Sequence, residues 1–179
     1  DFFTLKNIKT GSGKTDAYKP SEALKTLTEC YKYWIAYADL DGFRMDTVKH
    51  LDPGAVRFFV TEIKEFTQTL GKKDFYIVGE ITGGMEFAKS ICENTGLDAA
   101  LGINKIPEIL ESVAKGYSAA ENYFSIFTNS QVLSEGENQW YHKRVISMFD
   151  DHDMVYKPQH KERFTADKKT ALCLKMLSF

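Results

Sequence analysis

The sequence predicts an α/β fold in which the strands form a parallel sheet. Helix-type and strand-type segments alternate along the 179 residues, and the strand-type segments are short and mostly apolar. Apolar strands of this kind are typical of parallel sheets that helices cover on both faces. Strict alternation favours right-handed crossover connections between the strands. Three of the strands also end in ionisable residues, and strand ends are where a barrel of such units carries its reactive groups.

The chain begins with a polar segment, residues 1–19, which we interpret as a surface loop because it contains glycines and shows no hydrophobic periodicity. The first helix starts at Pro20-Ser21, with Ser21 as its N-cap, since a serine hydroxyl can accept a hydrogen bond from the first turn. Its apolar residues recur at helical spacing and predict one buried face: Leu24, Leu27, Tyr31, Trp34 and Ile35.

The next predicted elements are a strand over 40–46 and a second helix. The helix starts at Asp52-Pro53, because proline is tolerated in a first turn, and it ends at Gly71. An apolar stripe runs along it: Val56, Phe59, Val60, Ile63, Phe66 and Leu70.

A second apolar strand covers 75–79 and ends in Glu80. We predict a helix over 83–92 and a short strand over 97–101 after it.

The segment 106–133 has a helical pattern that is interrupted at Gly116, so one broken helix and two separate helices fit equally well. A third apolar strand, 145–149, precedes a helix over 166–179. These elements complete the alternating order.

The composition is that of a globular domain with a sizeable core, at 43% hydrophobic residues. A net charge of −2 and a pI near 6.1 argue against a nucleic-acid-binding protein. No apolar run approaches the roughly 18 residues of a membrane span. Cys30, Cys92 and Cys173 are too widely spaced to predict a disulfide framework or a zinc site.

The chain starts at Asp1 and stops within a predicted helix, so we expect it to be part of a longer polypeptide.

Charged residues concentrate at the end of the strand over 40–46. Asp46 lies between Arg44 and Lys49, and nearby positive charges favour the ionised form of a carboxyl group. The stretch therefore predicts a carboxylate that stays charged in a partly dry site, as an anionic nucleophile requires. A purely structural salt bridge at a strand end is an equally good interpretation of this stretch alone.

Three carboxyl groups, those of Asp46, Glu80 and Asp153, follow the three main strands. Glu80 leaves an apolar run and is expected to donate a proton, whereas Asp46 is expected to stay ionised. Two such groups about 5 to 5.5 Å apart constitute the apparatus of a retaining glycosidase. Asp153 would bind substrate hydroxyls or stabilise a cationic transition state. Two other interpretations of these residues are possible. Residues 150–153 could bind a divalent metal ion, or Lys49 could form a Schiff base with a substrate carbonyl.

At these residues the chain resembles the α-amylase family, glycoside hydrolase family 13. Residues 41–50 resemble the family's second conserved region, Val78-Gly79-Glu80 the third, and Phe149 with His152-Asp153 the fourth. The resemblance implies α/β architecture as part of a TIM (β/α)8 barrel, about strands four to seven with flanking helices, truncated at both ends. Residues 1–179 would form a portion of the catalytic barrel domain, with 20–179 as its repeated α/β units.

Two departures from the family pattern stand out. Asp151 occupies a position that is usually asparagine, and it adds a negative charge near the sugar site. The family's first conserved region is absent, together with the remaining barrel strands and the C-terminal domain. We therefore expect the isolated fragment to be inactive.

The resemblance also implies roles for individual residues. Asp46 would be the nucleophile, Glu80 the general acid/base and Asp153 the transition-state stabiliser. The substrate-binding residues would be Arg44, Lys49, His50 and His152. The backbone carbonyl of His50 would be one ligand of a structural calcium ion, while the chemistry itself would require no cofactor.

The implied function is that of a retaining α-glycosidase acting on α-1,4-glucans such as starch or maltooligosaccharides. A glucan transglycosylase of the same family and a non-catalytic binding relative are the alternatives. The expected partners are the glucan and the rest of the parent chain, and neither a nucleic acid nor a membrane.

Overall fold

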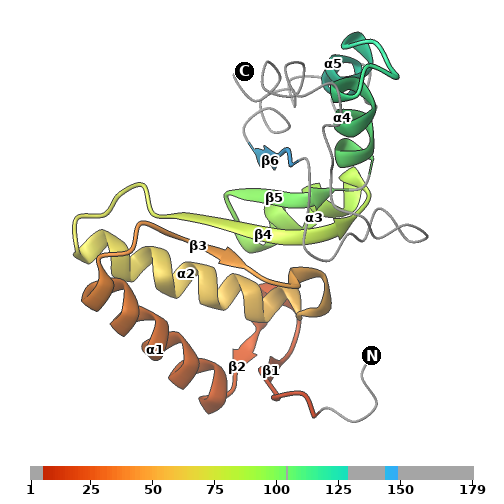
Figure 1. Cartoon of the computed structure of the whole chain (residues 1–179). Helices are drawn as coiled ribbons and strands as arrows, with labels where there is room; N and C mark the ends of the chain where they lie inside the picture. Colours follow the sequence, from red (N-terminus) through yellow and green to blue (C-terminus); the bar gives the residue numbers. More distant parts are fainter. Residues whose placement is uncertain (1–5, 104, 129–143, 149–179) are drawn as a thin grey trace. The chain divides into compact units, whose positions relative to one another are not determined.

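The computed structural model describes residues 6–103, 105–128 and 144–148 (Figure 1). The predicted α/β fold is confirmed, with four strands in one sheet in the order β3-β4-β5-β6. The predicted helix over 166–179 lies outside the described residues. The chain divides into two compact units, residues 1–79 with 90–98 and residues 80–89 with 99–179.

The N-terminal segment, predicted as a loop, contains a small antiparallel ribbon. Its strands are β1 (Gly11–Ser12) and β2 (Lys19–Pro20), with the 3-10 turn η1 (Thr15–Ala17) between them. The Tyr18 hydroxyl lies 2.9 Å from Thr10 Oγ1, and the Tyr18 ring packs on Gly54, where any Cβ would collide with it. Tyr18 therefore ties the ribbon to the start of the second helix.

Helix α1 (Glu22–Ala38) begins where its sequence predicts. The Leu24 N–H donates to Ser21 Oγ over 3.1 Å, which is the expected N-cap bond. The predicted apolar face is only partly buried, since Leu27 is 46% and Trp34 is 52% exposed while Ile35 is fully buried. Periodicity identifies the apolar residues of a helix but does not reveal which neighbouring element covers them.

Helix α2 (Pro53–Thr69) is capped by Asp52, whose Oδ1 accepts a hydrogen bond from Gly54 N–H over 2.8 Å. Its predicted stripe is buried from Val56 to Ile63, but Leu70 is 44% exposed and lies beyond the end of the helix. The predicted helix stop at Gly71 is confirmed, since this glycine follows the C-cap residue Leu70 and has a φ of 78°.

Strand β3 (Gly42–Met45) runs parallel to the first half of β4 (Tyr76–Gly83), with Phe43 opposite Ile77 and Met45 opposite Gly79. Aromatic rings join the elements of this unit. The Phe43 ring meets those of Tyr31 and Phe75 edge-on, with centroids 5.4 and 5.1 Å apart. Tyr31 in turn meets the Phe59 ring at 5.4 Å. These contacts set β3 between the two helices and β4.

Among its described residues, the second unit contains the end of β4, the start of the helix that follows it, strands β5 (Ala99–Ile103) and β6 (Val145–Ile146), and two further helices. Strands β5 and β6 are parallel, with Ala100 opposite Val145. Helices α4 (Ile106–Ala114) and α5 (Glu121–Thr128) are separate, so the two-helix interpretation is correct. The chain turns at Gly116, whose φ of 70° suits glycine.

Helix α3 (Met85–Thr95) connects β4 to β5 and ends three residues later than predicted. Its Thr95 hydroxyl, which is buried, donates to the Ile91 carbonyl over 2.6 Å. Among the described residues, no helix combines the length and the apolar character that crossing a bilayer would need.

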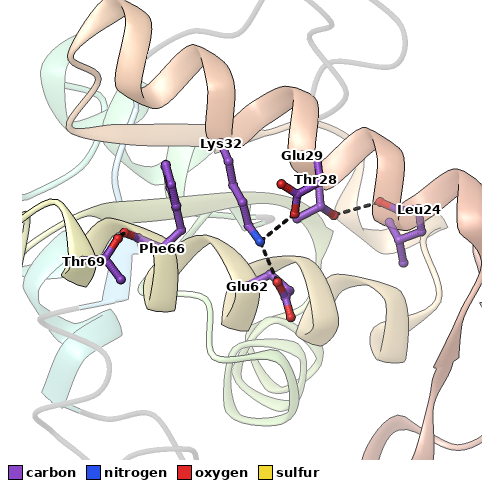
Figure 2. A network of polar contacts seen from close by, with 7 residues as sticks. All are labelled: Leu24, Thr28, Glu29, Lys32, Glu62, Phe66 and Thr69. Carbon is purple, nitrogen blue, oxygen red and sulfur yellow. Dashed lines mark hydrogen bonds and ion pairs between the residues drawn. The ribbon is translucent and has the colours of Figure 1, made fainter.

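Lys32 links the first two helices (Figure 2). Its Nζ lies 2.8 Å from Glu29 Oε1 on α1 and 2.7 Å from Glu62 Oε2 on α2, and the Lys32 side chain is 15% exposed. Desolvation lowers the pKa of Lys32, but the hydrogen bonds and charges of the two glutamates outweigh it and raise this pKa above 10.5. The folded state therefore binds this proton more tightly than the unfolded chain does.

We expect Lys32→Met to lower the free energy of unfolding by less than about 1 kcal/mol near neutral pH, because water screens the partly exposed ion pairs. The contribution of Lys32 is complete below the unfolded-state pKa and is lost as the pH rises through the higher folded-state value. Urea unfolding curves of the two proteins should therefore converge only as the pH rises above the folded-state pKa of Lys32.

The matched control is Lys25→Met, which removes only an exposed pair with Glu22 on the same helix. It should change the unfolding free energy little at any pH. A difference between wild type and Lys32→Met that persists in strong alkali would contradict the role assigned to the Lys32 charge.

Candidate active site

The structure brings Arg44 and Asp46 together at the end of β3. Arg44 Nη1 donates to Asp46 Oδ1 over 2.6 Å. The pair forms readily because side chains two residues apart on a strand point to the same face. A guanidinium at this distance favours the ionised carboxylate and restricts its orientation.

The surroundings of this pair are wetter than predicted. The Asp46 side chain is 62% exposed and that of Arg44 is 39% exposed. Strand β3 is the outermost strand in the described sheet order, with β4 as its single neighbour, and its residues are only partly buried. The Arg44–Asp46 pair thus lies in a largely exposed position.

Lys49 and His50 lie just beyond, in the 3-10 turn η2 (Val48–His50), and both are exposed. The turn is anchored by Val48, which is 1% exposed. Within the described ranges, no three His, Cys, Asp or Glu side chains gather in a cluster able to hold a metal ion. The calcium site with the His50 carbonyl stays a prediction.

Glu80 lies inside strand β4 and not at its end. The strand continues to Gly83, so the predicted end at residue 79 is wrong. Alternation places Glu80 on the strand face that Val78 and Thr82 share, while Ile77 and Ile81 point to the opposite face and are fully buried. The Glu80 residue is 4% exposed, which makes it a buried carboxyl group in a mainly apolar strand.

Gly102 in β5 is a residue that the sequence analysis missed. Its φ is +81°, and a Cβ built there would stand 3.4 Å from Thr82 Cγ2 and 3.9 Å from Glu80 Cγ. The β5 backbone therefore runs beside the Glu80 stem, and a side chain longer than alanine's would occupy space next to it. Gly102 directly follows the strand predicted over 97–101 but lies inside the observed strand, where a glycine often marks a close approach of another backbone or side chain.

The described residues also form a cavity of about 200 Å³, at the start of β4. It is lined by polar side chains, including the Lys64–Asp98 ion pair at 2.5 Å, and by Tyr76. Tyr76 begins the strand in which Glu80 comes later, so this cavity belongs to the opposite end of β4.

The residues that resemble the fourth conserved region, Phe149 with His152-Asp153, lie outside the described residues. The roles of His152 and Asp153 therefore stay predictions. Among the predicted site residues, the structure thus describes the Arg44–Asp46 pair and the η2 turn in one unit and buried Glu80 in the other.

No family model matches the chain. Over 98 residues the chain is 26% identical to a cyclomaltodextrin glucanotransferase from Klebsiella oxytoca. The matched segment is 55% of this chain and 14% of that protein. Over 60 residues the chain is 32% identical to an α-amylase from Streptomyces lividans. This segment is 34% of the chain and 6% of that protein. The chain thus spans a small part of the length of the curated relatives it matches.

Among solved structures, an Anoxybacillus α-amylase matches 87% of the chain with a TM-score of 0.61 and 23% sequence identity. The chain covers 30% of that structure. This likeness shows the fold: the alternating strands and helices correspond to part of an α-amylase barrel.

Proposed function

The chain is related to the α-amylase family of glycoside hydrolases, and on that premise we propose that it supplies the catalytic acids of a retaining α-glycosidase acting on α-1,4-glucans. Asp46 is the nucleophile and Glu80 is the general acid/base. Asp153 stabilises the transition state in this proposal. Residues of the parent protein beyond this chain would complete the site.

The observation that carries the proposal is the register of β3 on β4. The last pair is Met45 opposite Gly79, and the next residue of each strand segment is one of the two acids, Asp46 and Glu80. Arg44 and its register partner Val78 each lie two residues before one of the two acids. In a retaining mechanism the two carboxyl groups are about 5 to 5.5 Å apart.

The environments of the two acids support a division of roles. Asp46 is paired with a guanidinium and is exposed, which suits a group that must stay ionised to attack. Glu80 is 4% exposed in a strand with apolar neighbours, and in this proposal it delivers the proton to the departing sugar oxygen. In the second step Glu80 would act as a base and accept a proton from the attacking water, while the bond between the sugar and Asp46 breaks and Asp46 leaves as a carboxylate.

Lys49 and His50 would contact the sugar on the leaving-group side. Both are exposed on the turn that follows Asp46, so a glucan lying across that turn could reach them. His152 would bind hydroxyls of the sugar at the cleavage site.

A glucan transglycosylase is the second candidate. The relative that matches the longer part of the chain is a glucanotransferase, at 55% of the chain against 34% for the α-amylase. Such an enzyme would form the same covalent intermediate and pass the sugar to an acceptor hydroxyl in place of water.

The test is a proton NMR time course of the intact protein acting on maltoheptaose, in which anomeric signals and product lengths are followed together. New α-anomer together with shorter chains would support retaining hydrolysis. Longer chains formed alongside would favour the transglycosylase. If β-anomer appeared first, the enzyme would invert and the roles of Asp46 and Glu80 would need to be reassigned.

A further inference from the structure

Thr47, the residue directly after Asp46, has a strained backbone conformation. Its φ and ψ are 48° and 36°, in the left-handed region. Among the described residues, Asp39 and Lys105 are the other non-glycine residues with positive φ, and neither has a branched Cβ. A β-branched residue in this region is an outlier, because its Cβ substituents crowd the adjacent backbone.

The strain persists because the chain is anchored on both sides of Thr47. Met45 is held in the sheet opposite Gly79, and Val48 is 1% exposed. The turn is closed by hydrogen bonds from His50 N–H to the Thr47 carbonyl, at 2.9 Å, and from Leu51 N–H to the Val48 carbonyl, at 3.0 Å. Two residues, Asp46 and Thr47, therefore have to carry the chain from the strand into the turn.

Asp46 depends on this turn for its placement. Its side chain is 62% exposed, so packing contributes little to its orientation, and Arg44 contacts it from inside the strand. The backbone of Asp46 is set by β3 on one side and by Thr47 on the other. Strained residues of this kind are concentrated at sites where the strain fixes a working geometry.

We propose that Thr47 is a positioning residue, whose left-handed conformation holds the Asp46 carboxylate against Arg44 in the orientation needed for attack. The inference rests on the proposed function, in which Asp46 is the nucleophile. It assigns to Thr47 no contact with substrate. The conformation, and not the threonine hydroxyl, carries the effect.

Two substitutions in the intact protein test this proposal. Thr47→Gly relieves the strain but allows the backbone many other conformations, so Tm should stay the same or rise while kcat falls about tenfold to a hundredfold. KM should change by less than about twofold, because the loss concerns the transition state and not ground-state binding. Thr47→Asn should retain most of the wild-type kcat, because asparagine tolerates the left-handed region and still restricts the backbone.

The matched control is Asp39→Gly, at a residue with a φ of 52° that precedes the other end of β3. The substitution relieves a comparable backbone strain, but Asp39 precedes β3 whereas Asp46 follows it. We therefore expect kcat to stay unchanged. Its Asp39–Lys72 ion pair at 2.7 Å is lost, but Lys72 keeps Asp41 at 2.8 Å.

Three results would overturn the inference: an unchanged kcat in Thr47→Gly, an equal loss in Thr47→Gly and Thr47→Asn, or a marked fall of Tm in Thr47→Gly. Asp46→Ala, measured in the same assay, separates this inference from the proposed function. Activity that survives in Asp46→Ala refutes both. An inactive Asp46→Ala beside a fully active Thr47→Gly refutes only the role of Thr47.

Discussion

Asp46→Ala is expected to lower kcat on maltooligosaccharides by at least about a thousandfold, the scale on which removal of a covalent nucleophile acts. The fold should be retained, because the Asp46 side chain is 62% exposed and substitutions at such positions usually change stability by less than about 0.5 kcal/mol. Circular dichroism and Tm, recorded with the kinetics of the intact protein, distinguish the loss of the nucleophile from unfolding.

Chemical rescue gives this prediction a more specific form. In Asp46→Ala, added azide can enter the space that the carboxylate occupied and attack the anomeric carbon from the same face. The expected product is a β-glycosyl azide, with inverted configuration, because only one displacement takes place. Mass spectrometry and NMR would identify it.

Asp41→Ala is the matched control for Asp46. Asp41 precedes the same strand, and its side chain is 91% exposed. Its replacement should leave kcat within about twofold and should give no azide product. Near-normal turnover by Asp46→Ala, or rescue in both variants alike, would refute the nucleophile assignment.

Glu80→Gln is expected to lower kcat on maltooligosaccharides by about 10² to 10⁴, the range attributed to general acid/base catalysis. Glutamine keeps the volume of the buried side chain, which is 4% exposed in the folded protein. Its amide N–H groups can donate hydrogen bonds but are too weakly acidic to transfer a proton to the leaving sugar. The loss should therefore depend on the leaving group of the substrate.

An α-maltosyl fluoride tests that dependence, because fluoride is a weak base and needs little protonation to depart. Glu80→Gln should release fluoride in a rapid burst of one equivalent per enzyme, followed by slow turnover, because the second step still lacks a base. Equal losses on the fluoride and on maltooligosaccharides, without a burst, would contradict the acid/base role.

Glu86→Gln is the appropriate control for Glu80. Glu86 is an exposed residue in the first turn of α3 and lies six positions further along the chain. The same chemical change there should affect neither substrate. This comparison separates loss of the Glu80 proton from a general effect of one fewer negative charge.

Several elements were predictable because their causes are local. The start of α1 at Ser21 and that of α2 at Asp52 follow from capping bonds between residues two or three apart. The pairing of Arg44 with Asp46 is local in the same sense, since alternation along a strand sets both side chains on one face.

Other features depended on contacts that no short stretch encodes. The extension of β4 beyond Glu80 places an expected strand-end acid inside a strand, where it is 4% exposed. The exposure of Leu27 and Trp34 reflects which elements pack against α1, and apolar periodicity carries no information about this. The approach of Gly102 to Glu80 arises between residues 22 positions apart in the chain.

The sequence by itself determined the alternation of strands and helices, the helix starts and the identity of the candidate acids, because these depend on residue type and close spacing. Only the tertiary structure decided the burial of Glu80, the exposure of Asp46 and the left-handed turn at Thr47. Local preference disfavours that turn for a branched residue. It exists because the strand pairing of Met45 and the burial of Val48 leave the chain between them no other route.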